Sequence, residues 1–214
     1  PDPVGIALVD HACRLGQHVK CQDNQAIPGQ HGQWFGIGAM HRGLAPPMIR
    51  IMIFAADGAV RCGGNELLAA ALDPAVVGWI DLVAETVVAG KLLLEQGFHP
   101  LAIEDTFTLH HQPRVEEYTD HLFVIVRGLD FNTDQAVGEL QTLKLAAFLR
   151  PNLLITVHRA ELRSVKLVRS RVEESGRALP GGVVQLLWSI CDEMIDLYFP
   201  IIDDIGGRIE SLEQ

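Results

Sequence analysis

The chain of 214 residues is 48% hydrophobic and 21% charged, and it carries a formal net charge of −10 at pH 7. This hydrophobic content is sufficient for a folded core and excludes a chain that is disordered throughout. The acidic balance argues against a nucleic-acid partner, because such binding needs clustered Lys and Arg, whereas it is compatible with cations.

Residues 1–47 differ from the rest of the chain. They are rich in Gly, Gln, His and Pro and show weak periodicity, so we interpret them as an N-terminal extension of unknown role. Residues 48–181 are predicted to form one α/β domain. Within it, residues 49–54 are expected to be a strand that returns over 59–62 through an Asp57-Gly58 turn, which is the pattern of a β-hairpin.

The remainder of this domain alternates short strands with helices. Helices are predicted at 65–72 with Asn65 as its cap, at 85–96 ended by Gly97, at 99–107 with Pro100 in its first turn, and at 161–174. Strands are predicted at 76–82, 115–118, 121–129, 140–149 and 153–158, the last as a central strand because breakers bound its apolar run. This order predicts an α/β fold with a mixed β-sheet sandwiched between helices, an α/β/α arrangement.

Residues 182–214 are predicted to form one long amphipathic helix, the start of a stalk. Its apolar residues recur at steps of three and four: Leu187, Cys191, Met194, Tyr198, Ile202, Ile205, Ile209 and Leu212. Pro200 is expected to kink it, because proline removes one backbone donor and crowds the preceding turn. No stop signal follows Leu212, so we expect the helix to continue beyond Gln214. Apolar residues on more than one face favour burial against both its own domain and a neighbour.

Compartment and membrane signals are few in the sequence. Four scattered cysteines in a chain of this size favour a reducing compartment over a disulfide framework. No segment reaches the roughly 18 uninterrupted apolar residues of a membrane span. We therefore expect this stretch of sequence to be soluble.

The adjacent acids Glu104 and Asp105 are the sharpest local feature. They lie near the end of the predicted helix 99–107, and at about 100° per residue their carboxylates diverge. They are compatible with a plain surface, or with one or two ligands to a hard cation such as Mg²⁺, which keeps several waters. A metal-dependent hydrolase that uses His110 or His111 with either acid is an alternative.

Other chemical motifs are weak. His11, Cys13, His18 and Cys21 have loose zinc-ligand spacing without a knuckle or ribbon around them. A phosphate-binding loop, a nucleophile elbow and an HExxH motif are absent. The sequence therefore predicts a protein that is not an enzyme.

Two motifs carry a resemblance to a known family. The run His-Pro-Leu-Ala-Ile-Glu-Asp at 99–105, followed by Pro-Arg-Val-Glu at 113–116, resembles the CorA family of divalent-cation transporters. Further similar segments lie at 79–82, 121–126, 153–158 and 196–199. The resemblance covers residues 48–214. It implies the cytoplasmic domain of a homopentameric Mg²⁺ or Co²⁺ channel at the inner membrane, with no organic cofactor and with the membrane helices beyond Gln214.

The same resemblance implies a regulatory metal site between subunits. Asp105, with Glu104 nearby, would face the neighbouring protomer, and the partner ligands would be acids on the first turns of the stalk. The candidates there are Asp203, Asp204 and Glu210, while Gly206 and Gly207 occupy some of the stalk positions where the family carries acids. Two alternatives stay open: a Zn²⁺ transporter of the same superfamily, and a free-standing α/β ligand-binding module.

Overall fold

A computed structural model of the protein describes residues 48–83, 87–109, 111–129, 142–177 and 179–212. The extension predicted at 1–47, with its four candidate zinc ligands, lies outside the described residues, and so does His110.

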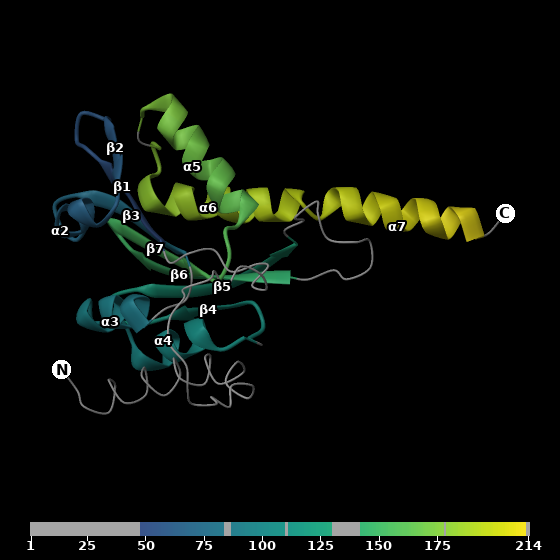
Figure 1. The fold of residues 1–214 in the computed structure, drawn as a ribbon, viewed down its shortest axis with the longest axis horizontal. Helices are drawn as coiled ribbons and strands as arrows, with labels where there is room; N and C mark the ends of the chain where they lie inside the picture. Colours follow the sequence, from purple (N-terminus) through teal and green to yellow (C-terminus); the bar gives the residue numbers. More distant parts are fainter. Residues whose placement is uncertain (1–47, 84–86, 110, 130–141, 178, 213–214) are drawn as a thin grey trace, which may run out of the picture.

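One seven-stranded sheet organises the described part of the chain (Figure 1). The strands are β1 (Met48–Phe54), β2 (Val60–Gly63), β3 (Val77–Val83), β4 (Arg114–Glu117), β5 (Leu122–Leu129), β6 (Thr142–Arg150) and β7 (Leu153–His158). Their order is β2-β1-β3-β7-β6-β5-β4. Only β3 and β7 pair in parallel, and the other neighbours are antiparallel. The mixed sheet predicted from the sequence is confirmed, with β7 at its centre.

Helices cover both faces of the sheet. They are the 3₁₀ helix η1 (Asn65–Leu67), α2 (Leu68–Ala71), α3 (Val87–Glu95), α4 (Pro100–Phe107), α5 (Arg163–Ser175), α6 (Gly182–Asp196) and α7 (Phe199–Leu212). Figure 1 shows α3 and α4 on one face, α5 and α6 on the other, and α7 projecting past the sheet. The predicted α/β/α arrangement is therefore confirmed.

Alternation along the strands builds a core on each face, because successive side chains of a strand point to opposite sides. Ile51 and Ile80 belong to the core under α3 and α4. Met52 and Trp79 belong to the core under α5 and α6. The central strand β7 is buried along its whole length, as a strand covered on both faces should be.

Two predicted helix ends have different outcomes. Gly97 ends α3 with a φ of 75°, a conformation in which a side chain is strained. Asn65, predicted as a cap, is instead the first residue of η1. Gly64 takes the cap position, where no side chain caps the helix, and its own N–H donates to Glu66 Oε1 over 2.7 Å.

The long helix predicted at 182–214 is divided into α6 and α7 at Leu197 and Tyr198. The Tyr198 N–H donates to the Ile195 carbonyl over 2.9 Å, which tightens the turn. Pro200 is the second residue of α7, a position where its missing N–H leaves no helical bond unmade. The predicted disturbance is confirmed, but it is a break before the proline and not a kink within one helix. No helix of the described part is long and apolar enough to cross a bilayer.

Candidate functional site

Helix α4 carries the predicted acids and is fixed at its N-terminus. His99 is the cap residue, and its Nδ1 accepts from the Leu101 N–H over 3.3 Å. The His99 ring stacks on Tyr118 at 4.7 Å, and Tyr118 stacks on the buried His121 at 4.7 Å. These stacked rings tie the start of α4 to the β4–β5 hairpin.

The C-terminus of α4 is held by a buried lysine from the sheet. Lys144, on β6, donates from Nζ to the carbonyl oxygens of Asp105 (3.1 Å) and Thr108 (2.7 Å), and to that of Thr106. The last carbonyls of a helix lack intrahelical partners and carry partial negative charge, so a cation stabilises them. Sequence reasoning missed this role. The available signal was a lysine between two leucines in a mostly apolar strand.

Asp105 is paired within its own chain. Its Oδ1 lies 2.8 Å from His111 Nε2, and its Oδ2 accepts from Arg114 Nη2. The Asp105 side chain is 18% exposed. Both carboxylate oxygens therefore have a cationic or hydrogen-bonding partner, and Asp105 is not a free surface acid.

Arg114 is shared between two acids. Its Nε lies 3.3 Å from Glu116 Oε1 on the same strand, while its Nη2 contacts Asp105. The Tyr118 hydroxyl donates to the other Glu116 oxygen over 2.7 Å. Burial and this bond raise the pKa of Tyr118 to about 12, so the hydroxyl remains a donor at physiological pH. The row Asp105, Arg114, Glu116, Tyr118 is a continuous polar network along the sheet edge.

The other predicted ligands lie elsewhere. Glu104 is half-buried on α4. Asp203, Asp204 and Glu210 are exposed on α7, which follows α6 on the other side of the sheet from α4 and projects past the sheet (Figure 1). Asp204 pairs with Arg208 one turn away at 2.8 Å. A single chain does not bring the α4 acids and the α7 acids together.

The donor type suits a hard divalent cation, because Mg²⁺ takes carboxylate oxygens and keeps several waters. Among the described residues, no three His, Cys, Asp or Glu side chains converge on one point. The described part of one chain therefore offers single carboxylates, and a complete site there needs further ligands from water or from a second chain.

One contact among the described residues supports the hydrolase alternative. His111 does meet Asp105, while His110 lies outside the described residues. Because Arg114 also engages Asp105, the carboxylate is held as an ion pair and is not poised as a free base. This contact holds His111 against α4.

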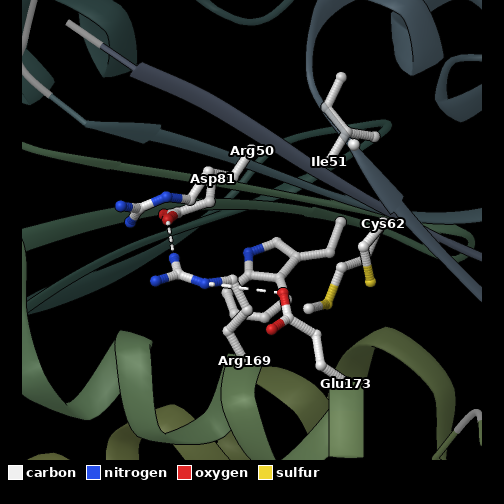
Figure 2. Close-up of a pocket in the computed structure, with 9 residues that line it drawn as sticks. Arg50, Ile51, Cys62, Asp81, Arg169 and Glu173 are labelled. Atoms are coloured by element: carbon white, nitrogen blue, oxygen red, sulfur yellow. Dashed lines mark hydrogen bonds and ion pairs between the residues drawn. The ribbon is translucent and has the colours of Figure 1, made fainter. Parts of the chain in front are cut away.

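A second polar cluster, which sequence reasoning missed, lies between the sheet and α5. Asp81 on β3 is 1% exposed. Its Oδ1 accepts from Thr156 Oγ1 (2.7 Å) and His158 Nε2 (2.8 Å), and its Oδ2 accepts from Arg169 Nη1 (3.3 Å). Figure 2 shows Asp81 and Arg169 pointing toward each other between strand and helix.

The surroundings of His158 favour its doubly protonated form. Its Nδ1 lies 2.6 Å from the Ala160 carbonyl and its Nε2 faces the Asp81 carboxylate, and both oxygens only accept. Burial works to lower the pKa of His158, but the Asp81 carboxylate outweighs burial and raises it. Burial likewise opposes ionisation of Asp81, yet His158, Thr156 and Arg169 together hold its pKa below the usual value.

The buried cluster extends to the surface through Glu161. Glu161 Oε1 accepts from Arg50 Nη1 over 2.8 Å and from Arg169 Nη2 over 3.2 Å. Arg50, Asp81 and Arg169 also line a cavity of about 240 Å³ beside Cys62. Glu173 Oε1 lies 4.0 Å from Arg169 Nε, which brings a third carboxylate to the three positive groups Arg50, His158 and Arg169. The cluster therefore joins α5 to strands β1, β3 and β7.

The domain is of the α/β/α class: a mixed sheet lies between two helical layers, and a terminal helix leads away from it. The family model for the CorA-like Mg²⁺ transporter protein matches residues 75–214, and the chain belongs to this family. Over 137 residues it is 28% identical to the "Putative metal ion transporter YfjQ" of Bacillus subtilis. Over 145 residues it is 26% identical to the cobalt/magnesium transport protein CorA of Thermotoga maritima. These matches cover 64% and 66% of this chain but 41% of each relative.

Solved structures share the fold at low sequence identity. The ZntB cytoplasmic domain of Vibrio parahaemolyticus aligns with a TM-score of 0.63 at 13% identity, covering 78% of this chain and 65% of that one. The full-length CmaX protein aligns with a TM-score of 0.63 at 17% identity, covering 81% and 53%. The soluble domain of CorA from Methanocaldococcus jannaschii aligns with a TM-score of 0.50 at 22% identity, covering 64% and 54%.

Proposed function

We propose that this chain is the cytoplasmic regulatory and assembly domain of a CorA-like divalent-cation transporter, with Mg²⁺ or Co²⁺ as cargo and regulatory ion. In the full-length protein it would belong to a homopentamer at the cytoplasmic face of the inner membrane. Family membership supports the transport role. One relative named above is described as a putative metal ion transporter and the other as a cobalt/magnesium transport protein, in agreement with a role that is not enzymatic.

The exposure of apolar side chains on α7 is the observation that supports the assembly role. None of its residues is buried in the single chain. Its large apolar side chains are exposed, among them Ile202 (59%), Ile209 (53%) and Leu212 (86%). A continuous apolar stripe on a projecting helix is a contact surface, and copies of the same helix are its proposed partners.

The regulatory role rests on acids from two separate elements. We assign Asp105 and Glu104 of one chain, with Asp203, Asp204 and Glu210 of a neighbour, as the candidate cation ligands. Facing carboxylates repel across an interface, and a bound cation neutralises them. High Mg²⁺ would thus favour the assembled, closed state, since a ligand shifts an equilibrium by its differential affinity for the two states.

The test is a thermal-melting titration of the 214-residue chain with MgCl₂ at concentrations where light scattering shows assembly. A cation at tenfold its Kd stabilises by about 1.4 kcal/mol, so the wild-type melting temperature rises. Asp105→Asn should lose most of that rise. Asp57→Asn, an exposed change in the β1–β2 turn, is the matched control. Equal shifts for Asp105→Asn and the wild type would exclude Asp105 as a ligand.

Two alternatives remain distinguishable by the same assay. The likeness to the ZntB domain fits a Zn²⁺ transporter equally well, and a larger melting shift with ZnCl₂ than with MgCl₂ would favour it. A free-standing ligand-binding module would show neither assembly nor a cation-dependent shift.

A further inference from the structure

Within one chain, Asp105 already has a positively charged partner. Arg114 Nη2 contacts Asp105 Oδ2, and His111 Nε2 lies 2.8 Å from Oδ1. A divalent cation bound at Asp105 Oδ2 would lie beside the guanidinium and be repelled by it, so cation binding favours departure of the guanidinium.

We propose that Arg114 is the built-in competitor for the cation at Asp105, and that it sets the cation affinity of the site. This inference rests on the proposed function, because it requires Asp105 to be a ligand. In the cation-free state Arg114 neutralises Asp105. In the bound state Arg114 turns away and the cation takes its place.

Arg114 has a second acidic partner, Glu116, when it leaves Asp105. Its Nε already lies 3.3 Å from Glu116 Oε1. The Tyr118 hydroxyl holds the other Glu116 oxygen at 2.7 Å, so this second carboxylate stays beside the arginine. The Arg114 side chain is 32% exposed, which leaves room for a rotamer change at the surface. The displaced guanidinium therefore keeps a counter-charge and is not left buried alone.

The backbone on both sides of this exchange is fixed. Lys144 holds the last carbonyls of α4, including that of Asp105 itself. Arg114 begins β4 and faces Ile125 in the antiparallel register of β4 and β5. Only side chains need to move, so the exchange is a local competition and not a rearrangement of the domain.

The competition predicts opposite effects for the two members of the pair. Arg114→Gln removes the competing charge and should lower the half-maximal MgCl₂ concentration by about tenfold. Asp105→Asn should abolish the response. Glu116→Gln removes the alternative partner, so Arg114 stays on Asp105 and the half-maximal concentration should rise by a few fold.

The experiment measures Mg²⁺ binding to the 214-residue chain and these variants by isothermal titration calorimetry at a fixed temperature, with circular dichroism to confirm folding. Arg61→Gln is the matched control, because it removes one arginine charge from an exposed position on β2. Its midpoint should stay within about twofold of the wild type. The double variant Asp105→Asn/Arg114→Gln should show no response, since the gained affinity acts through Asp105.

Each result has one meaning. A tenfold lower midpoint for Arg114→Gln, with Arg61→Gln unchanged, supports the competition. An unchanged midpoint for Arg114→Gln, while Asp105→Asn loses its response, overturns the competition and leaves the proposed function standing. A wild-type response in Asp105→Asn overturns both. If Arg114→Gln does not fold, Arg114→Lys keeps the charge but weakens the pairing geometry. Its midpoint should fall about threefold, and no change would overturn the proposal.

Discussion

Replacing Asp81 by Asn tests whether the buried polar cluster joins α5 to the sheet. The change removes one negative charge and almost no volume. His158 and Arg169, both nearly buried, then face a neutral amide in place of the carboxylate at 2.8 and 3.3 Å. Thr156 keeps an oxygen to which it can donate.

The expected cost follows from this geometry. Removing one partner of a buried ion pair costs about 3–5 kcal/mol, because the remaining charge stays buried and uncompensated. The retained amide oxygen and the link from Arg169 to Glu161 place Asp81→Asn at the lower end, about 3 kcal/mol. That is a large part of the roughly 5–15 kcal/mol that stabilises a typical domain.

Urea unfolding followed by far-ultraviolet circular dichroism measures this loss. With a slope of about 2–3 kcal/mol per M, the midpoint should fall by about 1 M. Asp204→Asn is the matched control, because it breaks an exposed pair one helical turn apart and should cost no more than about 0.5 kcal/mol. A loss under about 1 kcal/mol for Asp81→Asn would refute the view that its charge is needed to hold His158 and Arg169.

Two further predictions concern pH and packing. The pKa of His158 is raised in the folded chain, so its charge contributes stability that is present in full below the unfolded pKa near 6.5 and is lost as pH rises through the folded pKa. The wild-type melting temperature should therefore fall with rising pH, and His158→Gln should flatten that fall. Parallel curves for the two proteins would contradict the linkage. Gly78→Ala would place a Cβ 2.9 Å from the Ala71 carbonyl oxygen and should destabilise the chain by about 1–3 kcal/mol in urea. Gly207→Ala meets nothing within 4 Å on exposed α7 and should raise the helical signal at 222 nm instead; a comparable loss of stability in both would show that backbone crowding is not the cause.

The sheet could be predicted because its signals are local. The β1–β2 hairpin follows from alternation around Asp57-Gly58, and β7 from an apolar run bounded by breakers. The break between α6 and α7 was harder, because apolar spacing continues across it. The signal was Pro200, which is compatible both with a kink inside a helix and with the start of a new one.

Only part of the candidate site was predictable. The spacing of residues 99–105 predicted α4 and its acids, and nearby Arg114 was part of the same motif. Lys144 and the Asp81 cluster were not foreseen, because they join residues separated by 36–88 positions. Such contacts depend on strand order and register, which local patterns do not specify. The ligand role of Asp105 and of the α7 acids stays a prediction.

Helix α7 also has a consequence for the thermodynamics of assembly. It is 14 residues long, includes Gly206 and Gly207, and buries none of its residues in one chain. A helix of this length is marginal in water, and each glycine costs it about 1 kcal/mol relative to alanine. Its helicity should therefore depend on the concentration of chains, because contact with a second copy supplies the burial that the single chain lacks. Coil-to-helix conversion and subunit association would then be one cooperative step.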